Sequence, residues 1–333
     1  MPPLQVLYPR MGASRRRLLC LAFAAVLCSP GAFAQDTTIR VGHFPNITHA
    51  QALVARAMER QGNDWFKRYL GAEVKIEWYS YNAGPSAMEA IFADSIDLAY
   101  VGPSPALNAY SRSRGEEVRI VAGAVKGGSA LVVQPDGGFT KAADFKGKRI
   151  ATPQFGNTQD VAARAWLAAG GLRVTQTGGD AFVVPTQNPD QLSLFKQKEL
   201  AAVWTVEPWI SRLEMEAGGK VLVNETEAIT TILVSSRKAL QERAKLVKRF
   251  VAAHNDLTGW IASHPEEAQS LLRSELNAQT RIQVGADLVA RAWGRMKVTT
   301  DLKLEEFRSW VADAQNAGFL RGVPDLAGLM ATP

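Results

Sequence analysis

One stretch of this chain passes twice from a turn of small residues into a predicted helix, with a short apolar strand at 98–101 between the two helices. The turns lie at 82–84 and 102–105. Pro85 follows the first turn, and Pro105 is the last residue of the second. Proline is tolerated at the first helical position because its missing N–H has no helical partner there. The remaining free N–H groups and the positive end of the helix dipole favour anions. These helix starts, which carry Ser86 and Ser104, predict a pocket for a small anion.

The same alternation of strand and helix continues along the chain. Strands are expected near 39–42, 74–79, 98–101, 118–124, 130–133, 150–152, 182–184, 200–205 and 230–234. Strands that alternate with helices predict an α/β fold with a parallel-type sheet. A Gly-Gly break at 127–128 and the strand at 230–234 indicate two crossings between lobes. The predicted lobes are residues 36–125 plus 230–333 and residues 126–229, and the part beyond residue 237 is predicted to be helical without a strong strand.

The first 34 residues have the pattern of an export signal. Three arginines at 15–17 precede an apolar run at 18–28, which is too short to span a bilayer. An Ala-x-Ala site ends at Ala34, so cleavage there would place the mature protein in the periplasm. Translation starts at Met1 or at Met11. The arginines also resemble a twin-arginine signal without its usual lysine, so the export route stays open, and an uncleaved membrane anchor is the alternative.

Charge and cysteine content limit the possible partners. Both cysteines, Cys20 and Cys28, lie in the signal, so the mature chain is predicted to have no disulfide, thiolate metal site or cysteine nucleophile. The formal charge of +6 falls to +2 without the signal, since 34 basic residues then face 32 acidic ones. No nucleic-acid partner is expected. The four histidines are His43, His49, His254 and His264. No metal is expected, because His43 and His49 are six residues apart across a turn and there is no His-rich tract. No cofactor is expected either.

Two further helix starts carry capping signals. Thr48 with Gln51 predicts a capping box, and Asn157 followed by Asp160 predicts an N-cap. Residues in and beside these caps are candidate ligand contacts, and plain capping or turn formation is the alternative for each. The candidates are Pro45, Asn46, Thr48, Asn157, Thr158 and Gln159. Ser129, just past the Gly-Gly break, is also expected to face the cleft.

Four segments resemble the substrate-binding proteins of bacterial ABC importers, in the branch for sulfonates, taurine and nitrate. They are residues 41–50 with a Phe-Pro-Asn turn, 88–97, 144–151 and 203–209, and their order and spacing match from about 39 to 234. The resemblance implies a two-lobed periplasmic binding protein fold (type II), in which each lobe is a mixed sheet flanked by helices and the ligand lies in the cleft between. It also implies a receptor rather than an enzyme. Such a receptor hands its ligand to a permease in the inner membrane, and we expect a monomer.

The segment around Glu207 carries the most chemical information. A carboxylate at the end of an apolar strand is costly to bury without a cation or donors. The role that the resemblance implies is to meet an amine or hydroxyl of the ligand, or to lock the lobes through an arginine. Trp204 and Trp209 are expected to line the ligand's carbon chain, with core packing as the alternative.

The helix starts offer neutral N–H and hydroxyl donors and contain no arginine, which suits an aliphatic sulfonate or taurine. Nitrate, bicarbonate and pyrimidine precursors are the alternative ligands. A lyase or transferase on the same fold is the alternative class. It is disfavoured because the mature chain has no cysteine, Gly-x-Ser-x-Gly elbow or P-loop, and Glu207 lacks an evident partner as a general base. A sensor that binds the same ligand is not separated from a transport receptor.

Overall fold

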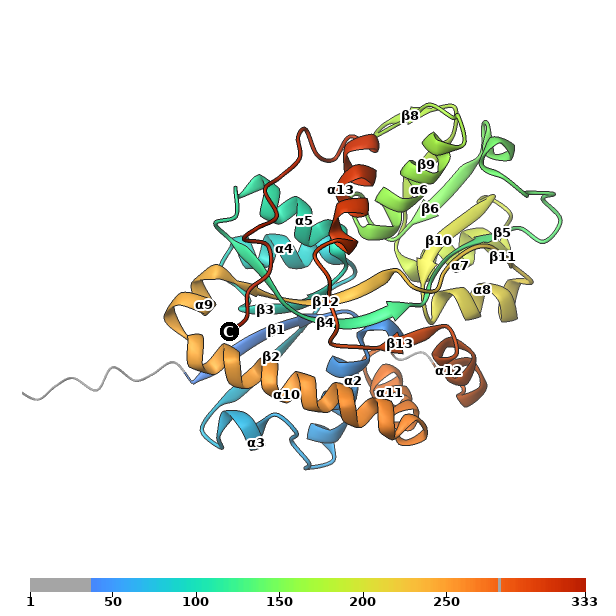
Figure 1. The fold of residues 1–333 in the computed structure, drawn as a ribbon. Helices are drawn as coiled ribbons and strands as arrows, with labels where there is room; N and C mark the ends of the chain where they lie inside the picture. Colours follow the sequence, from blue (N-terminus) through green and yellow to red (C-terminus); the bar gives the residue numbers. More distant parts are fainter. Residues whose placement is uncertain (1–36, 281–282) are drawn as a thin grey trace, which may run out of the picture. The chain divides into compact units, whose positions relative to one another are not determined.

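The structure is a computed structural model that describes residues 37–280 and 283–333, so the predicted export signal lies outside the described residues. Residues Thr38–Pro333 form one compact unit. Within it the strands form two main sheets and a small ribbon of β7 (Val174–Thr175) and β8 (Gly178–Gly179) (Figure 1). In the part of the chain that the structure describes, no helix is long and apolar enough to cross a membrane.

The first sheet has six strands. Its spatial order is β13 (Met296–Val298), β4 (Val118–Gly127), β12 (Ile229–Ser236), β3 (Leu98–Val101), β1 (Thr38–His43) and β2 (Lys75–Ser80). Strand β1 runs parallel to β2 and β3, whereas β12 is antiparallel to β3 and β4. The sheet is therefore mixed, and the strand that returns from the second sheet lies at its centre.

The second sheet has five strands. Its order is β11 (Lys220–Glu225), β5 (Ser129–Val133), β10 (Ala202–Val206), β6 (Arg149–Thr152) and β9 (Phe182–Pro185). Strand β6 is parallel to β9 and β10, and β5 is antiparallel to β10 and β11. The chain passes between the sheets at Gly127 and Gly128, and again between β11 and β12. Gly127 has a φ of 74°, and a Cβ there would lie 2.4 Å from the carbonyl oxygen of Arg295, so this crossing requires glycine.

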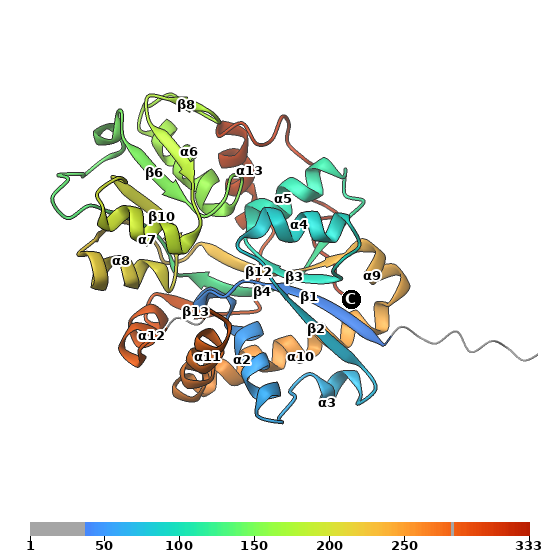
Figure 2. The same cartoon turned by 180° about the vertical axis from the view of Figure 1, so that it is seen from behind.

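Helices cover both faces of both sheets (Figures 1 and 2). On the first sheet, α2 (Ala50–Arg60), α10 (Ala244–Ser263) and α11 (Pro265–Thr280) lie opposite α4 (Gly84–Phe92) and α5 (Pro103–Arg112). On the second sheet, α6 (Thr158–Ala169) lies opposite α7 (Asn188–Lys196) and α8 (Trp209–Ala217). Helix α13 (Glu306–Asn316) packs on both α5 and α6. The shorter helices are α3 (Lys67–Leu70), α9 (Arg237–Glu242) and α12 (Ala286–Trp293).

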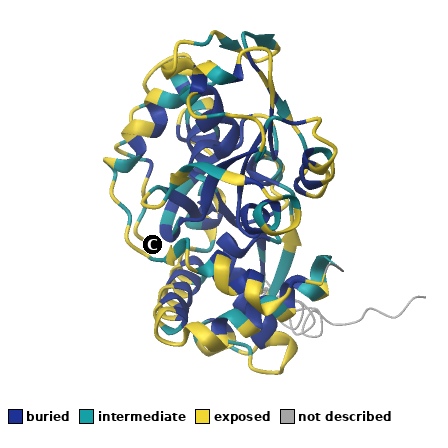
Figure 3. Ribbon diagram, turned by 90° about the vertical axis from the view of Figure 1, so that its right-hand side faces the viewer, coloured by how far each residue is buried: buried dark blue, intermediate teal, exposed yellow. Residues whose placement is uncertain are grey.

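Strand β3 shows how the apolar pattern forms two cores. Successive side chains of a strand point to opposite faces. Leu98 and Tyr100 therefore join the core under α2 and α10, while Ala99 and Val101 join the core under α4 and α5. A strand that is buried on both faces reads as a continuous apolar run, and Figure 3 shows such strands in the buried colour.

The predicted α/β class with mixed sheets is confirmed, and the strand at 98–101 has the bounds that the sequence predicts. The C-terminal part is predicted to have no strong strand, and it adds β13, a strand of three residues that pairs with β4 at the edge of the first sheet. The predicted capping box at Thr48 is wrong. Residues Ile47–His49 form a 3-10 turn before α2, and the Gln51 side chain donates instead to Ala124 O at 2.8 Å and to Thr258 at 3.2 Å.

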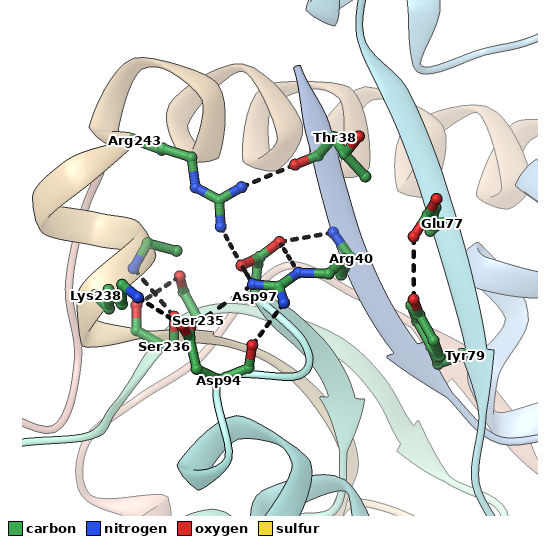
Figure 4. A network of polar contacts seen from close by, with 11 residues as sticks. Thr38, Arg40, Glu77, Tyr79, Asp94, Asp97, Ser235, Ser236, Lys238 and Arg243 are labelled. Atoms are coloured by element: carbon green, nitrogen blue, oxygen red, sulfur yellow. Dashed lines mark hydrogen bonds and ion pairs between the residues drawn. The ribbon is translucent and has the colours of Figure 1, made fainter. Parts of the chain in front are cut away.

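At the amino ends of the parallel strands, the buried carboxylate of Asp97 joins three segments (Figure 4). It accepts from the backbone N–H of Arg40 at 2.7 Å and from the Arg40 guanidinium at 2.8 Å. Arg243 donates to the same carboxylate and to Thr38 O. Because Arg243 stands at the start of α10, the network fixes this helix against β1 at the end of the sheet away from the strands' carboxyl ends.

His254 is buried between α10 and β4, where it accepts from the Tyr100 hydroxyl at 3.0 Å and donates to Gly123 O at 2.8 Å. Burial lowers the pKa of His254 to about 4. In an unfolded chain the histidine pKa is about 6.5. The unfolded chain therefore binds an additional proton between these two values, and stability falls as the pH drops from about 6.5 to about 4.

We predict that His254→Gln removes this proton uptake on unfolding. The slope of unfolding free energy against pH should decrease by up to about 1.4 kcal/mol per pH unit near pH 5, because one proton fewer is bound on unfolding. Urea denaturation over a pH series measures the slope. Tyr100→Phe is the control: it leaves His254 Nδ1 unpaired and costs about 1–2 kcal/mol, but it retains the slope. An unchanged slope in His254→Gln would show that this ring is not buried in its neutral form.

Candidate functional site

A small cavity lies where several strands of the two sheets end and helices begin. Its volume is about 30 Å³. It is lined by Phe44, Asn46, Thr48, His49, Asn82, Ala83, Gly84, Gly102, Pro105, Pro153, Asn157, Thr158, Gln159, Val206, Thr230 and Thr231. Ligands of α/β sheets commonly bind at the carboxyl ends of strands beside helix N-termini. The cavity is the candidate site for this reason.

The structure brings five of the sequence-predicted ligand residues together in this lining. They are Asn46, Thr48, Asn157, Thr158 and Gln159. The other predicted residues are not in the lining, and three of them, Ser104, Ser129 and Trp209, form a hydrogen bond with a lining residue. The predicted residues outside the lining are Pro45, Ser86, Ser104, Ser129, Trp204, Glu207 and Trp209.

Trp209 lies behind Asn46 in this arrangement. Its indole N–H donates to Asn46 Oδ1 at 3.1 Å. An indole N–H is only a donor, so the carbonyl oxygen of the Asn46 amide must face Trp209. The Asn46 NH₂ group is therefore the part left for the cavity, and Trp209 orients a candidate ligand residue instead of lining the site.

The N-cap of α6 fixes a second amide. Asn157 Oδ1 accepts from the backbone N–H of Asp160 at 2.9 Å, which confirms the predicted cap. The Asn157 amide nitrogen then donates to Gln159 Oε1 at 3.1 Å, and Gln159 Nε2 donates to Ser129 Oγ at 3.2 Å. Each of these amides uses its oxygen as an acceptor and retains a further N–H donor.

His49 adds another donor. Its Nδ1 accepts from the backbone N–H of Phe44 at 3.3 Å. Burial, with His43 as a second cause, lowers the pKa of His49 well below its ordinary value. The ring is thus neutral, and because Nδ1 accepts, Nε2 carries the proton. The lining has no Asp, Glu, Lys or Arg side chain among the described residues, and His49 is its one titratable group.

The side-chain hydroxyl of Thr231 on β12 is the described lining group with the clearest lack of a hydrogen-bond partner. This hydroxyl is buried and has no hydrogen-bond partner among the described residues. The register of β12 against β4 shifts at this residue, and such bulges redirect side chains. Its neighbour Thr230 donates to Gly127 O at 2.6 Å. A buried hydroxyl without a partner is costly, so this position favours a bound polar group.

The start of α5 offers fewer donors than the sequence predicts. Pro103 and Pro105 have no N–H, and the Ser104 N–H donates to Thr158 Oγ1 at 3.4 Å. The Ser104 hydroxyl is buried without a partner among the described residues but does not line the cavity. A Cβ on Gly102 would lie 2.2 Å from Thr158 Oγ1, so the two helix starts are in direct contact here.

Glu207 does not reach the cavity lining. Its buried carboxylate accepts from the Ser211 N–H at 3.1 Å, the Ser211 hydroxyl at 2.9 Å and Arg295 at 2.9 Å. Burial raises the pKa of Glu207, and the Ser211 and Arg295 contacts oppose that rise. Of the two roles that the resemblance implies, the geometry matches the pairing with an arginine.

The remaining predicted residues occupy supporting positions. Trp204 is buried, packs edge-to-face on Trp166 and donates to Glu225 at 3.2 Å. Ser86 accepts from the Gln154 amide at 2.9 Å, and Pro45 is half-buried in the first loop. Trp204 therefore follows the core-packing alternative that the sequence left open.

Sequence reasoning missed His49, Asn82 and Thr231 as lining residues. Asn82 belongs to the small-residue turn that opens α4, so a local signal for it existed. Thr231 reaches the cavity through a bulge in β12, and His49 through the 3-10 turn before α2. Neither backbone feature has a signature in the sequence. Among the described residues, no group of three or more His, Cys, Asp or Glu is placed to hold a metal ion.

A buried ion pair supports the loop that presents Asn157 and Thr158. Asp160 accepts from Arg164 at 3.1 Å, from the Thr152 hydroxyl at 3.0 Å and from the N–H of Gly156 at 2.9 Å. Arg164 also donates to Val183 O, and both charged side chains are almost fully buried. The loop into α6 is thus anchored to the strands of the second sheet.

Comparison with known sequences finds one matching family and relatives that are named as binding proteins. The model of a family described as NMT1-like matches residues 33–274. A putative binding protein of Brucella abortus is 24% identical over 310 residues, which cover 90% of this chain and 91% of that protein. A putative aliphatic sulfonates-binding protein of Bacillus subtilis is 28% identical over 213 residues, 62% of each chain.

Solved structures share the fold. The alkanesulfonate-binding protein of Xanthomonas axonopodis pv. citri, bound to MOPS, gives a TM-score of 0.68 at 22% identity, over 84% of this chain and 91% of that one. The periplasmic nitrate-binding protein of Synechocystis PCC 6803 gives 0.71 at 15% identity, over 86% and 83%. A Candida albicans protein described as having the generic periplasmic binding protein fold gives 0.67 at 16% identity, over 89% and 96%. The predicted periplasmic binding protein fold is therefore confirmed.

We predict that Arg164→Leu destabilises the protein by about 3–5 kcal/mol, because it leaves the buried Asp160 carboxylate without its cation. Chemical denaturation measures the loss. Arg149→Leu is the matched control, because Arg149 pairs with Glu199 at 3.7 Å and both side chains are about half exposed. Its expected cost is below about 1 kcal/mol. Equal costs for the two variants would contradict the anchoring role of the buried pair.

Proposed function

This chain belongs to the NMT1-like family, and from that premise we propose that it is a periplasmic receptor for a small organic oxyanion, most simply an aliphatic sulfonate or taurine. It passes this ligand, as a monomer, to the permease of an ABC importer in the inner membrane. The export signal, cleaved after Ala34, brings it to the periplasm. Nitrate, bicarbonate and pyrimidine precursors are the alternative ligands.

One observation carries the proposal: four polar side chains of the cavity lining have an acceptor occupied and retain a donor, whereas Asn82 and Thr230 each donate to a backbone carbonyl. Asn46, Asn157 and Gln159 each use the amide oxygen in an internal hydrogen bond, and His49 uses Nδ1. The hydroxyl of Thr231 adds a donor without a partner among the described residues. Neutral donors beside the N-termini of α4 and α6 favour an anion without any salt bridge.

The lining favours a receptor over an enzyme. General acid–base chemistry needs a group that gains or loses a proton near the working pH. Burial keeps His49, the one titratable lining side chain among the described residues, in its neutral form. The relatives named for binding support the same class.

We propose that residues 36–125 plus 230–333 form one lobe and residues 126–229 the other, with their hinge at the two crossings between the sheets. A cavity of about 30 Å³ admits only one or two water molecules. Pockets for small-molecule ligands usually measure about 300–1,000 Å³. Ligand entry therefore requires the two sheets to move apart about Gly127 and Gly128.

Calorimetry and thermal-shift measurements with methanesulfonate, taurine, nitrate and bicarbonate test the ligand class. We expect the sulfonates to bind, with a stabilisation of about 2.7 kcal/mol when the ligand is at 100 times its dissociation constant. Binding of nitrate alone would replace the sulfonate by an inorganic oxyanion. If no member of the panel bound, the oxyanion proposal would fail, and a pyrimidine precursor would be the next candidate ligand.

We predict opposite effects of Thr231→Val on stability and on binding. Removing a buried hydroxyl without a partner should stabilise the ligand-free protein by about 1 kcal/mol. The same change should weaken sulfonate binding about tenfold or more, because a hydrogen bond to a charged group is lost. Denaturation and calorimetry measure the two effects. Thr231→Ser retains the hydroxyl and should bind like the parent; a Val variant that also did so would exclude Thr231 from the site.

A further inference from the structure

Behind the cavity, the carboxylate of Glu225 ends a chain of hydrogen bonds. Glu225 is the last residue of β11 and is not among the residues that line the cavity. The Ser129 hydroxyl donates to Glu225 Oε2, and the Trp204 indole donates to the same oxygen at 3.2 Å. An ionised carboxylate only accepts hydrogen bonds. Ser129 therefore uses its single hydrogen on Glu225 and faces the cavity side as an acceptor.

The direction set at Ser129 continues to the start of α6. Ser129 Oγ accepts from Gln159 Nε2 at 3.2 Å, so the oxygen of that amide faces Asn157, whose Nδ2 donates to it at 3.1 Å. At the far end, Asn157 Oδ1 accepts from the backbone N–H of Asp160 at 2.9 Å. All four hydrogen bonds thus run in the same direction, from a fixed backbone donor to a fixed carboxylate.

The direction of these hydrogen bonds decides whether Gln159 presents an N–H or an oxygen to the cavity. With the chain in its observed direction, the amide nitrogens of Asn157 and Gln159 each retain one N–H. If the group at residue 225 were itself a donor, Ser129 could donate to Gln159 only after that amide had turned over. The Gln159 NH₂ would then face the Asn157 NH₂, which the Asp160 N–H holds in place, and two donors cannot bond to each other. Gln159 would also direct an oxygen, instead of an N–H, to its surroundings.

Building on the proposed function, we propose that Glu225 is a positioning residue that fixes the direction of this chain and so keeps the amide donors of Asn157 and Gln159 available to the bound oxyanion. Glu225 itself does not touch the ligand. Its contribution is distinct from that of the lining residues, since it acts through Ser129.

Simple electrostatics predicts the opposite sign. A negative charge near an anion site repels the anion, so its removal would strengthen binding. In the proposed role, neutralising Glu225 weakens binding, because the direction of the donors is no longer enforced. The sign of the effect therefore separates the two accounts without any assumption about its size.

The positioning role and simple charge repulsion also predict opposite dependences of the affinity on pH. Burial raises the pKa of Glu225, and the carboxylate of Asp313 on α13 raises it further, while the donors Ser129 of β5 and Trp204 of β10 lower it. Asp313 is the charged group that faces it, and its own pKa is raised by burial. As the pH falls through the raised pKa, Glu225 takes up a proton and can donate to Ser129. We expect the affinity for a sulfonate to fall over this range, whereas charge repulsion alone would make it rise.

The experiment compares Glu225→Gln with the parent by calorimetry, with methanesulfonate as the probe at about pH 7.5 and at lower pH. An amide at residue 225 both donates and accepts, so it no longer enforces the direction. We expect affinity to fall at least about threefold and its decrease at acid pH to disappear. Asp313→Asn is the matched control: it removes a carboxylate that lies near Glu225 but is not part of the hydrogen-bond chain. It should bind within about twofold of the parent, with the acid midpoint moved to lower pH.

Two further measurements keep the test decisive. Ser129→Ala interrupts the series of hydrogen bonds between Gln159 and Glu225. Adding Glu225→Gln to this variant should therefore change the affinity no further, which a double-mutant cycle measures. In the ligand-free protein, the side-chain amide NMR signals of Asn157 and Gln159 should change in Glu225→Gln but not in Asp313→Asn. Unchanged or tighter binding in Glu225→Gln, or unchanged amide signals, would overturn the proposal. Absence of binding in the parent would count against the proposed function alone, since the amide signals still decide the role of Glu225.

Discussion

The buried ion pair between Glu207 and Arg295 holds together the segments on which the site depends. The backbone N–H of Glu207 donates to Gly128 O at the first crossing, and its carbonyl accepts from the N–H of Ile47 in the first loop. Its carboxylate binds Ser211 of α8 and Arg295 just before β13. A carboxylate without water needs all of these donors, and removing one partner of such a pair costs about 3–5 kcal/mol. The ion pair fixes Glu207, and the main-chain carbonyl of this residue anchors the first loop next to Asn46.

Buried carboxylates next to the lining residues are paired with arginines, and the cavity lining itself consists of neutral side chains. Glu207 and Asp160, two buried carboxylates that each follow a lining residue in the sequence, are each paired with an arginine and with a backbone N–H group. The lining itself is left with neutral side chains whose orientation is set from behind by donors or acceptors of fixed type. Trp209 acts in this way on Asn46, and the Asp160 N–H on Asn157. Under the proposed function, such a site selects its ligand by the direction of its hydrogen bonds and needs no counter-charge to hold a permanently ionised oxyanion.

The sequence predicts the features that are decided locally. The strand at 98–101 and the N-cap in which Asn157 accepts from the Asp160 N–H depend on neighbouring residues, and both are found as predicted. The capping box at Thr48 has an equally good local pattern and is absent, because Gln51 is drawn to partners on β4 and α10. The arginine that pairs with Glu207 lies 88 residues away, so the sequence leaves its identity open. The bulge that turns Thr231 toward the cavity is likewise a property of the assembled sheet.

The sequence predicts Ser104 and Thr158 as ligand contacts, whereas in the structure they form a hydrogen bond with each other. Each stands at a helix start, and here the Ser104 N–H donates to Thr158 Oγ1 at 3.4 Å while Gly102 allows the two helices to touch. A hydrogen bond of this length is weak. Breaking this one contact would therefore sacrifice little and would release a backbone donor and a hydroxyl at the same time. The Ser104 N–H and the Thr158 hydroxyl thus satisfy one another only loosely, and under the proposed function an oxyanion that accepts from both offers them a better partner.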